Sequence, residues 1–236
     1  MRKAISTTLL ILIMATTGRA QSVYTYQFYN NLLASGQGPK LTAVCPPTFS
    51  AHTFTNLKGA VHPVCHFDKA CGFVFEDTGN LLARGGYTIE MYMALDVAGG
   101  YVKLIDYKNL ADDVGLYDNQ RACTFRGPGS VSGEYFEDAR YSFVTITRDA
   151  GTKEVKMYVN GGFVDGFTDS DHDYAVYDGN KTLRFLQDDK YSSGSETSSG
   201  NIAFLRIYNY PLDAVAVKIH YASLDSTLRI KPVSKI

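Results

Sequence analysis

Apolar and polar residues alternate over short stretches along most of the chain, and this pattern predicts β-strands. In the clearest stretch, 87–95 (YTIEMYMAL), apolar side chains recur at every second position, which is the period of a half-buried strand. The stretch 101–107 follows the turn sequence AGG, and DAGT joins 141–148 to 154–160, so both are expected to form antiparallel hairpins. Further strands are expected at 24–28, 41–44, 72–75, 183–186 and 202–208.

Only one segment, 212–224, has the spacing of a helix. Pro211 and Asp213 open it, as is usual for a first turn and its cap. Its apolar positions at helical spacing are Ala214, Val217, Tyr221 and Leu224. No internal repeat and no Pro- or Ser-rich linker divides residues 21–236, so we expect one domain there. Many short antiparallel strands followed by one short C-terminal helix predict an all-β sandwich of the jelly-roll type.

The first twenty residues are typical of a secretory signal peptide. They begin with a basic Arg-Lys pair, continue with an apolar stretch at 9–14, and place Gly18 and Ala20 at the −3 and −1 positions of a cut before Gln21. The alternative is an N-terminal anchor helix, but a bilayer span needs roughly 20 apolar residues, and this stretch is far shorter. No later segment is predicted to span a membrane. The mature chain is therefore expected to be secreted, in an extracellular or periplasmic location.

Composition and charge narrow the class of partner. The 236 residues are 45% hydrophobic and include 17 Tyr and 13 Phe but no Trp, which favours β-structure with a sizeable core. Removal of residues 1–20 would leave 20 basic against 24 acidic side chains, a net charge of −4. This charge argues against nucleic acid as a partner.

Four cysteines in an exported chain predict two disulfides. Cys45 and Cys71 stand at the two ends of a Pro-containing stretch without clear periodicity, so we favour a Cys45–Cys71 bond, which leaves Cys65 to pair with Cys123. A local Cys65–Cys71 bond is the main rival. Closure of the loop between Cys45 and Cys71 would contribute about 3.5 kcal/mol by the chain-entropy argument.

A zinc site is the other use that these cysteines could have. The segment HPVCHFDKAC places His62, Cys65, His66 and Cys71 close together in the sequence. Their spacing matches no common structural zinc pattern, so the disulfide interpretation is preferred.

Five segments follow one another in a recognisable order between residues 24 and 224. They are YTIEMYMALDVAGGYVKLIDYKN, GLY, YSFVTITRDAGTKEVKMYVNG, LRFLQDD and NIAFLRIYNYPLDAVAV. This order resembles the laminin G-like, concanavalin A-like jelly-roll superfamily, and its most specific parts are the hairpin ending in YVNG and the LRIYNYPL before the helix. The resemblance implies a secreted, non-catalytic binding or adhesion module for carbohydrate or for extracellular matrix or cell-surface protein.

The resemblance extends to pentraxins, which bind calcium through an acidic loop after the strand similar to LRF and an acidic pair in an earlier loop. Calcium takes six to eight oxygen ligands, and two loops at one end of a sandwich can supply them. The alternative is that these acidic residues are solvated turn residues. The calcium ligands that the resemblance implies are Asp112, Asp113, Gln187, Asp188, Asp189 and Glu196.

Several glycoside hydrolases share this architecture, so catalysis has to be judged from the residues. Retaining hydrolysis needs two carboxylates about 5 Å apart, as on a Glu-x-Asp-x-x-Glu strand. Glu90 has no second acid two or four positions away, and the Glu134, Glu137 and Asp138 group has the wrong order. We therefore expect no enzyme activity. A structural envelope or matrix protein without a small ligand remains the alternative to a binding module.

Overall fold

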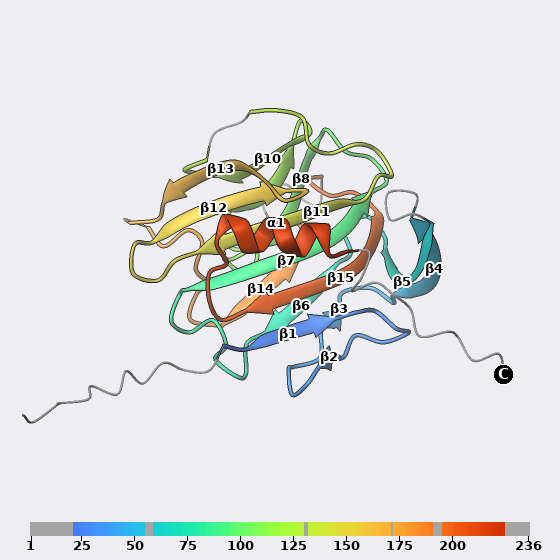
Figure 1. The fold of residues 1–236 in the computed structure, drawn as a ribbon, viewed down its shortest axis with the longest axis horizontal. Coiled ribbons are helices and arrows are strands. Elements are labelled where there is room, and N and C mark those ends of the chain that lie inside the picture. The colour runs from blue at the N-terminus through green and yellow to red at the C-terminus, as the bar shows by residue number, and fades with distance from the viewer. Residues whose placement is uncertain (1–20, 55–58, 130–131, 171, 191–194, 225–236) are drawn as a thin grey trace, which may run out of the picture.

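The computed structural model describes residues 21–54, 59–129, 132–170, 172–190 and 195–224, and in these ranges the chain forms two antiparallel sheets that pack face to face (Figure 1). The larger sheet comprises β1 (Val23–Tyr26), β2 (Ala34–Ser35), β4 (Thr48–Phe54), β5 (Ala60–Phe67), β7 (Tyr87–Leu95), β11 (Ser142–Arg148), β12 (Glu154–Val159), β13 (Gly162–Thr168) and β15 (Gly200–Tyr208). The smaller sheet comprises β3 (Thr42–Ala43), β6 (Phe73–Glu76), β8 (Tyr101–Asp106), β9 (Gly115–Asn119), β10 (Ala122–Arg126) and β14 (Thr182–Phe185). This confirms the predicted sandwich.

Strand order places distant parts of the sequence beside each other. The larger sheet runs β13-β12-β11-β7-β15-β1-β2, and the β4–β5 hairpin joins it through β5 and β15. The smaller sheet runs β10-β9-β8-β14-β6-β3. β14 pairs with β8 in antiparallel orientation, and the two loops that follow these strands meet where the backbone N–H of Lys190 donates a hydrogen bond to the carbonyl oxygen of Leu110.

The central strand β7 shows how the sheets bury their side chains. Ile89, Met91 and Met93 belong to the main core between the sheets, whereas Tyr92 packs in a second cluster with Phe204 on the outer face of the same sheet. All nine residues of β7 are buried because α1 (Ala214–Ala222) covers this outer face (Figure 1). Alternate side chains of β7 therefore pack in two different apolar clusters, one between the sheets and one on the outer face of the larger sheet.

The helix begins and ends close to the predicted positions. Asp213 caps α1, and its Oδ1 accepts a hydrogen bond from the backbone N–H of Ala216 at 2.7 Å. Val217 is buried against the sheet, whereas Val215 and Ile219 are exposed. In the described part of the chain no helix is long and apolar enough to cross a membrane.

The stretch between Cys45 and Cys71 corrects one prediction. It contains the β4–β5 hairpin instead of irregular structure, and Pro63 lies within β5 opposite Ala51. The proline and the weak alternation of β4 hid this hairpin in the sequence. Cys45 and Cys71 are disulfide-bonded with a Cα–Cα distance of 5.5 Å, as predicted.

The predicted Cys65–Cys123 bond is wrong. Cys65 lies on β5 of the larger sheet and Cys123 on β10 of the smaller sheet, and both carry free, buried thiols. These strands belong to different sheets: β5 pairs with β4 and β15 in the larger sheet, and β10 is an edge strand of the smaller sheet. A zinc site with Cys71 is also inconsistent with the structure, because its sulfur is bonded to Cys45. The predicted signal peptide lies outside the described residues.

Candidate functional site

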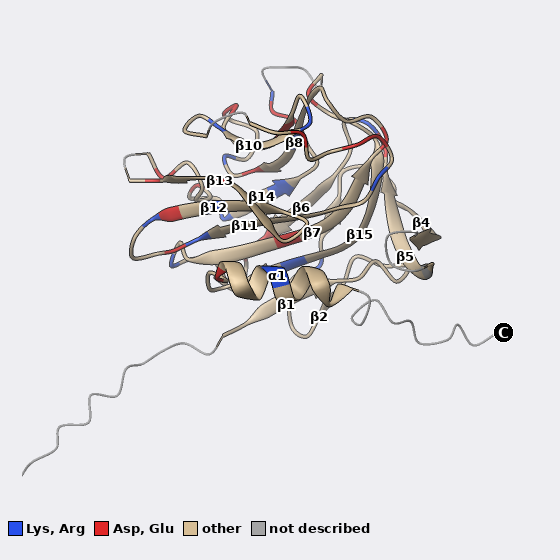
Figure 2. Ribbon diagram, turned by 45° about the horizontal axis from the view of Figure 1, so that its top comes forward, with Lys and Arg blue, Asp and Glu red and all other residues tan. Residues whose placement is uncertain are grey.

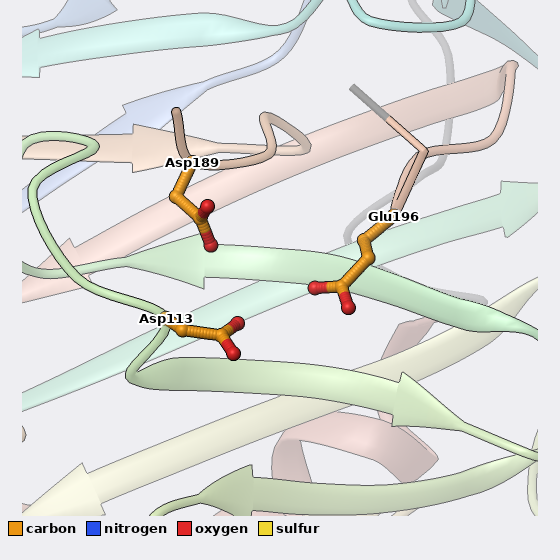
Figure 3. A group of neighbouring side chains, drawn as sticks. All are labelled: Asp113, Asp189 and Glu196. Atoms are coloured by element: carbon orange, nitrogen blue, oxygen red, sulfur yellow. The ribbon is translucent and has the colours of Figure 1, made fainter. Parts of the chain in front are cut away.

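Three of the predicted calcium ligands lie close together beside the smaller sheet. Asp113 precedes β9, Asp189 follows β14 and Glu196 precedes β15, and the three carboxylates point toward one another (Figure 3). One oxygen from each lies within 4.8 Å of the others, so by distance alone the group could hold a metal ion. We refer to Asp113, Asp189 and Glu196 as the loop cluster.

Two of the predicted ligands face elsewhere. Asp112 is exposed, and only its backbone carbonyl reaches the cluster, where it accepts a hydrogen bond from Lys103 Nζ at 2.9 Å. Gln187 Oε1 accepts a hydrogen bond from Arg184 Nη1 at 2.8 Å. Of the six predicted ligands, the structure therefore brings the carboxylates of Asp113, Asp189 and Glu196 together.

Asp188 shapes the loop that carries the cluster. Its Oδ1 accepts a hydrogen bond from the backbone N–H of Asp189 at 2.8 Å, and its Oδ2 accepts one from the backbone N–H of Glu196 at 3.0 Å. These bonds tie the start of the loop to its end. Both carboxylate oxygens of Asp188 thus stabilise the loop backbone.

A buried lysine, which the sequence pattern did not indicate as part of a site, lies in the middle of this region. The Lys103 side chain is 0% exposed, and its Nζ lies 2.9 Å from Asp189 Oδ2, 3.2 Å from Asp106 Oδ2 and 2.9 Å from the Asp112 carbonyl oxygen. An ammonium has three N–H donors, so these three oxygens satisfy it. The Nζ also lies 5.4 Å from the ring centre of Tyr117.

Arg126 supplies a second cation from β10. Its guanidinium forms ion pairs with Asp113 and with Glu196, the latter at 3.3 Å, and it lies 5.6 Å from the ring centre of Tyr101. Tyr117 donates its hydroxyl hydrogen to Asp113 Oδ1 at 2.9 Å. Each carboxylate of the loop cluster is therefore in contact with a positively charged side chain.

As arranged here, the cluster residues do not fit a calcium ion. Calcium needs six to eight oxygens at about 2.3–2.6 Å, whereas Lys103 and Arg126 already take up oxygens of all three carboxylates. Burial, reinforced by the negative charge of Asp113, also raises the pKa of Glu196, which favours a proton on that carboxylate. The calcium site stays a prediction that these contacts oppose.

A groove of about 560 Å³ opens on the outer face of the larger sheet, between the β12–β13 hairpin and the start of α1. We call it the β12–α1 groove. Neither its volume nor its position was predicted, because it forms between segments that are distant in the sequence. Its lining residues are Thr147, Asp149, Thr152, Glu154, Lys156, Tyr158, Phe163, Pro211, Leu212, Asp213 and Ala214.

The alternation of β12 creates the floor of this groove. Val155 and Met157 point into the core between the sheets, so Glu154, Lys156 and Tyr158 occupy the opposite, outer face. The sequence showed this alternation, but a polar outer face is ordinary for a sandwich and did not mark a binding site.

One wall of the groove is an exposed aromatic side chain. Phe163, at the start of β13, is 60% exposed and packs edge-on against Tyr158, with ring centres 5.8 Å apart and planes at 74°. The connection from β15 to α1, residues 211–214, forms the other wall. Phe163 thus presents an aromatic face beside polar groups.

Charged groups of both signs line the polar part of the groove. Asp149 Oδ1 accepts hydrogen bonds from the backbone N–H groups of Thr152 and Gly151, at 2.7 and 2.9 Å. These bonds, Thr152 first, hold the pKa of Asp149 below its usual value, so the group is a carboxylate at neutral pH. Lys156 Nζ lies 2.8 Å from Glu154 Oε2. In the view of Figure 2, basic and acidic positions are interspersed along the ribbon.

Two of the acids considered for catalysis are held in ion pairs with basic side chains. The Glu90 side chain is 0% exposed beneath α1 and is bound by His220 at 2.7 Å, Tyr208 at 3.0 Å and Arg206 at 3.3 Å. Glu137 lies on the surface in an ion pair with Arg140. Glu90 is therefore a structural anchor for the helix, out of reach of a substrate.

Comparisons with solved structures show the same fold in carbohydrate- and receptor-binding proteins. Domain 4 of a GH43 extracellular arabinanase from Geobacillus stearothermophilus, in complex with arabinotriose, is 16% identical with a TM-score of 0.62, over 83% of this chain and 96% of that one. Botulinum neurotoxin type C, whose cell entry depends on two ganglioside molecules, is 13% identical with a TM-score of 0.62, over 91% of this chain and 53% of that one.

The binding domain of botulinum neurotoxin DC in complex with rat synaptotagmin II is 14% identical with a TM-score of 0.59, over 86% of this chain and 51% of that one. The chain thus spans about half the length of these toxin structures, and at such identities the likeness shows the fold alone. No curated protein sequence matches. The family model of the concanavalin A-like lectin/glucanases superfamily matches residues 72–218, which is more than half of the chain. The chain therefore belongs to this superfamily, in its laminin G-like branch.

Proposed function

We propose that the mature chain is a secreted, non-catalytic binding module that recognises carbohydrate through the β12–α1 groove. The observation that carries this proposal is the exposed ring of Phe163 beside carboxylates and an ammonium. The apolar faces of sugar rings stack on aromatic side chains, and their hydroxyl groups hydrogen-bond to carboxylates and amines. The groove supplies both kinds of contact within one open site.

The comparisons support carbohydrate as the ligand class. The arabinanase domain was solved with arabinotriose, and the binding domain of botulinum neurotoxin DC was solved in complex with SialylT. Extracellular protein is the second candidate, favoured by the complex of that toxin domain with synaptotagmin. An open groove that combines a single exposed aromatic ring with several charges suits a sugar chain better than a wide protein interface.

The carboxylates in the groove argue against hydrolysis. A glycosidase needs one carboxylic acid whose pKa is raised so that it can donate a proton. The pKa of Asp149 is instead lowered, Asp213 caps α1, and Glu154 pairs with Lys156. We infer that these groups accept hydrogen bonds from a ligand and do not catalyse its cleavage.

A glycan array tests the proposed function. The wild-type chain should bind a restricted set of oligosaccharides, and Phe163→Ala should lose most of that signal. Tyr29→Ala is the matched control, because Tyr29 is also an exposed aromatic residue, at 40%, but does not line the groove. Equal signals from wild type and Phe163→Ala would reject the groove as the site.

Export can be tested by intact-mass analysis of secreted material. The signal-peptide prediction gives a chain that begins at Gln21, and the Cys45–Cys71 bond supports an oxidising location. Alkylation after denaturation without reduction should modify two thiols, those of Cys65 and Cys123. A chain that retains Met1, or one that carries no free thiol, would contradict this account.

A further inference from the structure

Lys103 links three segments of the chain in the way that a bound metal ion would. Its ammonium bridges Asp106 at the end of β8, the Asp112 carbonyl in the loop before β9 and Asp189 after β14. A charge buried without partners is very unfavourable, but here every N–H donor has an oxygen within 3.2 Å. The contacts of Lys103 therefore define a complete cation site whose cation is part of the protein.

Arg126 closes the outer side of the same region. It holds Asp113 and Glu196 together from β10, and its side chain is 42% exposed. Without such a cation, the converging carboxylates would repel one another. Lys103 on the inner side and Arg126 on the outer side thus bring the loops together by ion pairing.

The remaining negative charge is stabilised by the backbone. Asp106 Oδ1 accepts hydrogen bonds from the N–H groups of Lys108 and Leu110, at 3.1 and 3.0 Å. Asp188 accepts its two bonds from the N–H groups of Asp189 and Glu196. Such bonds stabilise the ionised form of a carboxylate without any metal. Glu196 differs: Arg126 pairs with its Oε1, whereas its Oε2 is buried with no hydrogen-bond partner among the described residues.

Entry of calcium would require that the lysine leave. An ion within reach of Asp189 Oδ2 would lie close to the Lys103 ammonium, which is only 2.9 Å from that oxygen, and the two cations would repel each other. Because the Lys103 side chain is fully buried, its ammonium would also have to leave a site in which it has no contact with solvent. The ion pair between Lys103 and Asp189 therefore already occupies the place that a calcium ion would need.

We propose that Lys103 and Arg126 are built-in cations that take the place of calcium in the loop cluster, so that the cluster is assembled and stable without metal. The inference is independent of carbohydrate binding, because it concerns the loops after β8 and β14 and is tested by stability, whereas the groove is tested by affinity.

Thermal unfolding of the wild-type chain is the primary test. The Tm should be the same in millimolar calcium chloride and in chelator, and elemental analysis after desalting should find no stoichiometric calcium. A Tm that rises by several degrees in calcium, or one calcium per chain after desalting, would overturn the proposal.

The variant Lys103→Met tests the position of the cation. It keeps an unbranched side chain, one atom shorter than lysine, but leaves Asp106 and Asp189 without the ammonium, so in chelator the Tm should fall by about 10 °C. Calcium should restore part of this loss, because the uncovered oxygens can then bind it. Lys153→Met is the control: Lys153 is 40% exposed, so its loss should shift the Tm by little, with no response to calcium.

A loss no larger than that of Lys153→Met, or a loss that calcium does not reduce, would contradict the assigned role of Lys103. If Lys103→Met does not yield folded protein, Arg126→Gln replaces it, since Arg126 is partly exposed. That variant frees Asp113 and Glu196 and should show a smaller loss with the same calcium response; no calcium response would overturn the proposal.

Discussion

The loop cluster and the β12–α1 groove both contain carboxylates, lysine and aromatic rings, yet they differ in what those groups contact. In the loop cluster, Lys103 is buried and its donors are all used by protein oxygens. In the groove, Phe163 is 60% exposed and Lys156 and Glu154 form a surface ion pair. The first region is closed, and the second is open to a ligand.

This difference shows that a concentration of acidic residues in the sequence need not mark a binding site. The acidic residues after β14 were predicted to bind calcium because they stand close together in the sequence. In the structure they form hydrogen bonds and ion pairs that hold the loops together. Nothing in the sequence indicated the groove, because its residues are spread over β11, β12, β13 and the start of α1. The two regions differ in whether their charged groups are already bound by other groups of the protein.

The largest effect is expected from loss of a buried charge in the loop cluster. Asp189→Asn removes one of the two carboxylates that neutralise the buried Lys103, and this should cost about 3 kcal/mol of unfolding free energy. Asp112→Asn is the control, because the side chain of Asp112 is exposed and should change stability by less than about 0.5 kcal/mol. Denaturant unfolding of both variants measures the contrast. Equal losses would contradict the conclusion that Asp189 neutralises a buried charge in the loop cluster.

The opposite result is expected for a charge in the groove. Lys156→Met breaks a surface ion pair with Glu154, and such pairs contribute about 0–1 kcal/mol, so the Tm should hardly change. Binding of an array-selected oligosaccharide should weaken several-fold, because one hydrogen-bond donor of the groove is lost. Calorimetric titration and thermal unfolding of the same sample provide both values. A large fall in Tm with unchanged affinity would reverse the assignment of the groove.

A smaller effect is expected in the pH dependence of stability. Burial first, and then Asp113, raise the pKa of Glu196 in the folded chain. A raised carboxyl pKa means that the folded state binds the proton more tightly, so this contribution is complete below the unfolded pKa and is lost as pH rises through the folded pKa. Glu196→Gln should remove this slope at pH values above the ordinary pKa of a glutamate, about 4.3. An unchanged slope in denaturant unfolding at several pH values would contradict it.

Much of the fold could be predicted from local pattern. The alternation of β7 and the cap at Asp213 gave correct elements because these signals depend on neighbours in the sequence. The β4–β5 hairpin was missed because Pro63 is unusual inside a strand. The predicted Cys65–Cys123 bond was wrong because an even number of cysteines does not show which of them lie close together in the fold.

The candidate sites depended more on tertiary structure. Convergence of Asp113, Asp189 and Glu196 was predicted from the resemblance, but Lys103 was not recognised as their partner. The available signal in the sequence was a lysine between the apolar residues Val102 and Leu104 of β8. The groove had no comparable local signal, because residues 211–214 approach β12 only when α1 packs on the sheet.

Carbohydrate recognition by Phe163 in the groove is the central claim, and isothermal titration calorimetry tests it most directly. The oligosaccharide with the strongest array signal would be titrated into wild type and Phe163→Ala, both in chelator. The account predicts binding by the wild type without calcium and an affinity at least about tenfold lower for Phe163→Ala, a loss of about 1.4 kcal/mol. Equal affinity in the two proteins, or wild-type binding that appears only with calcium, would contradict it.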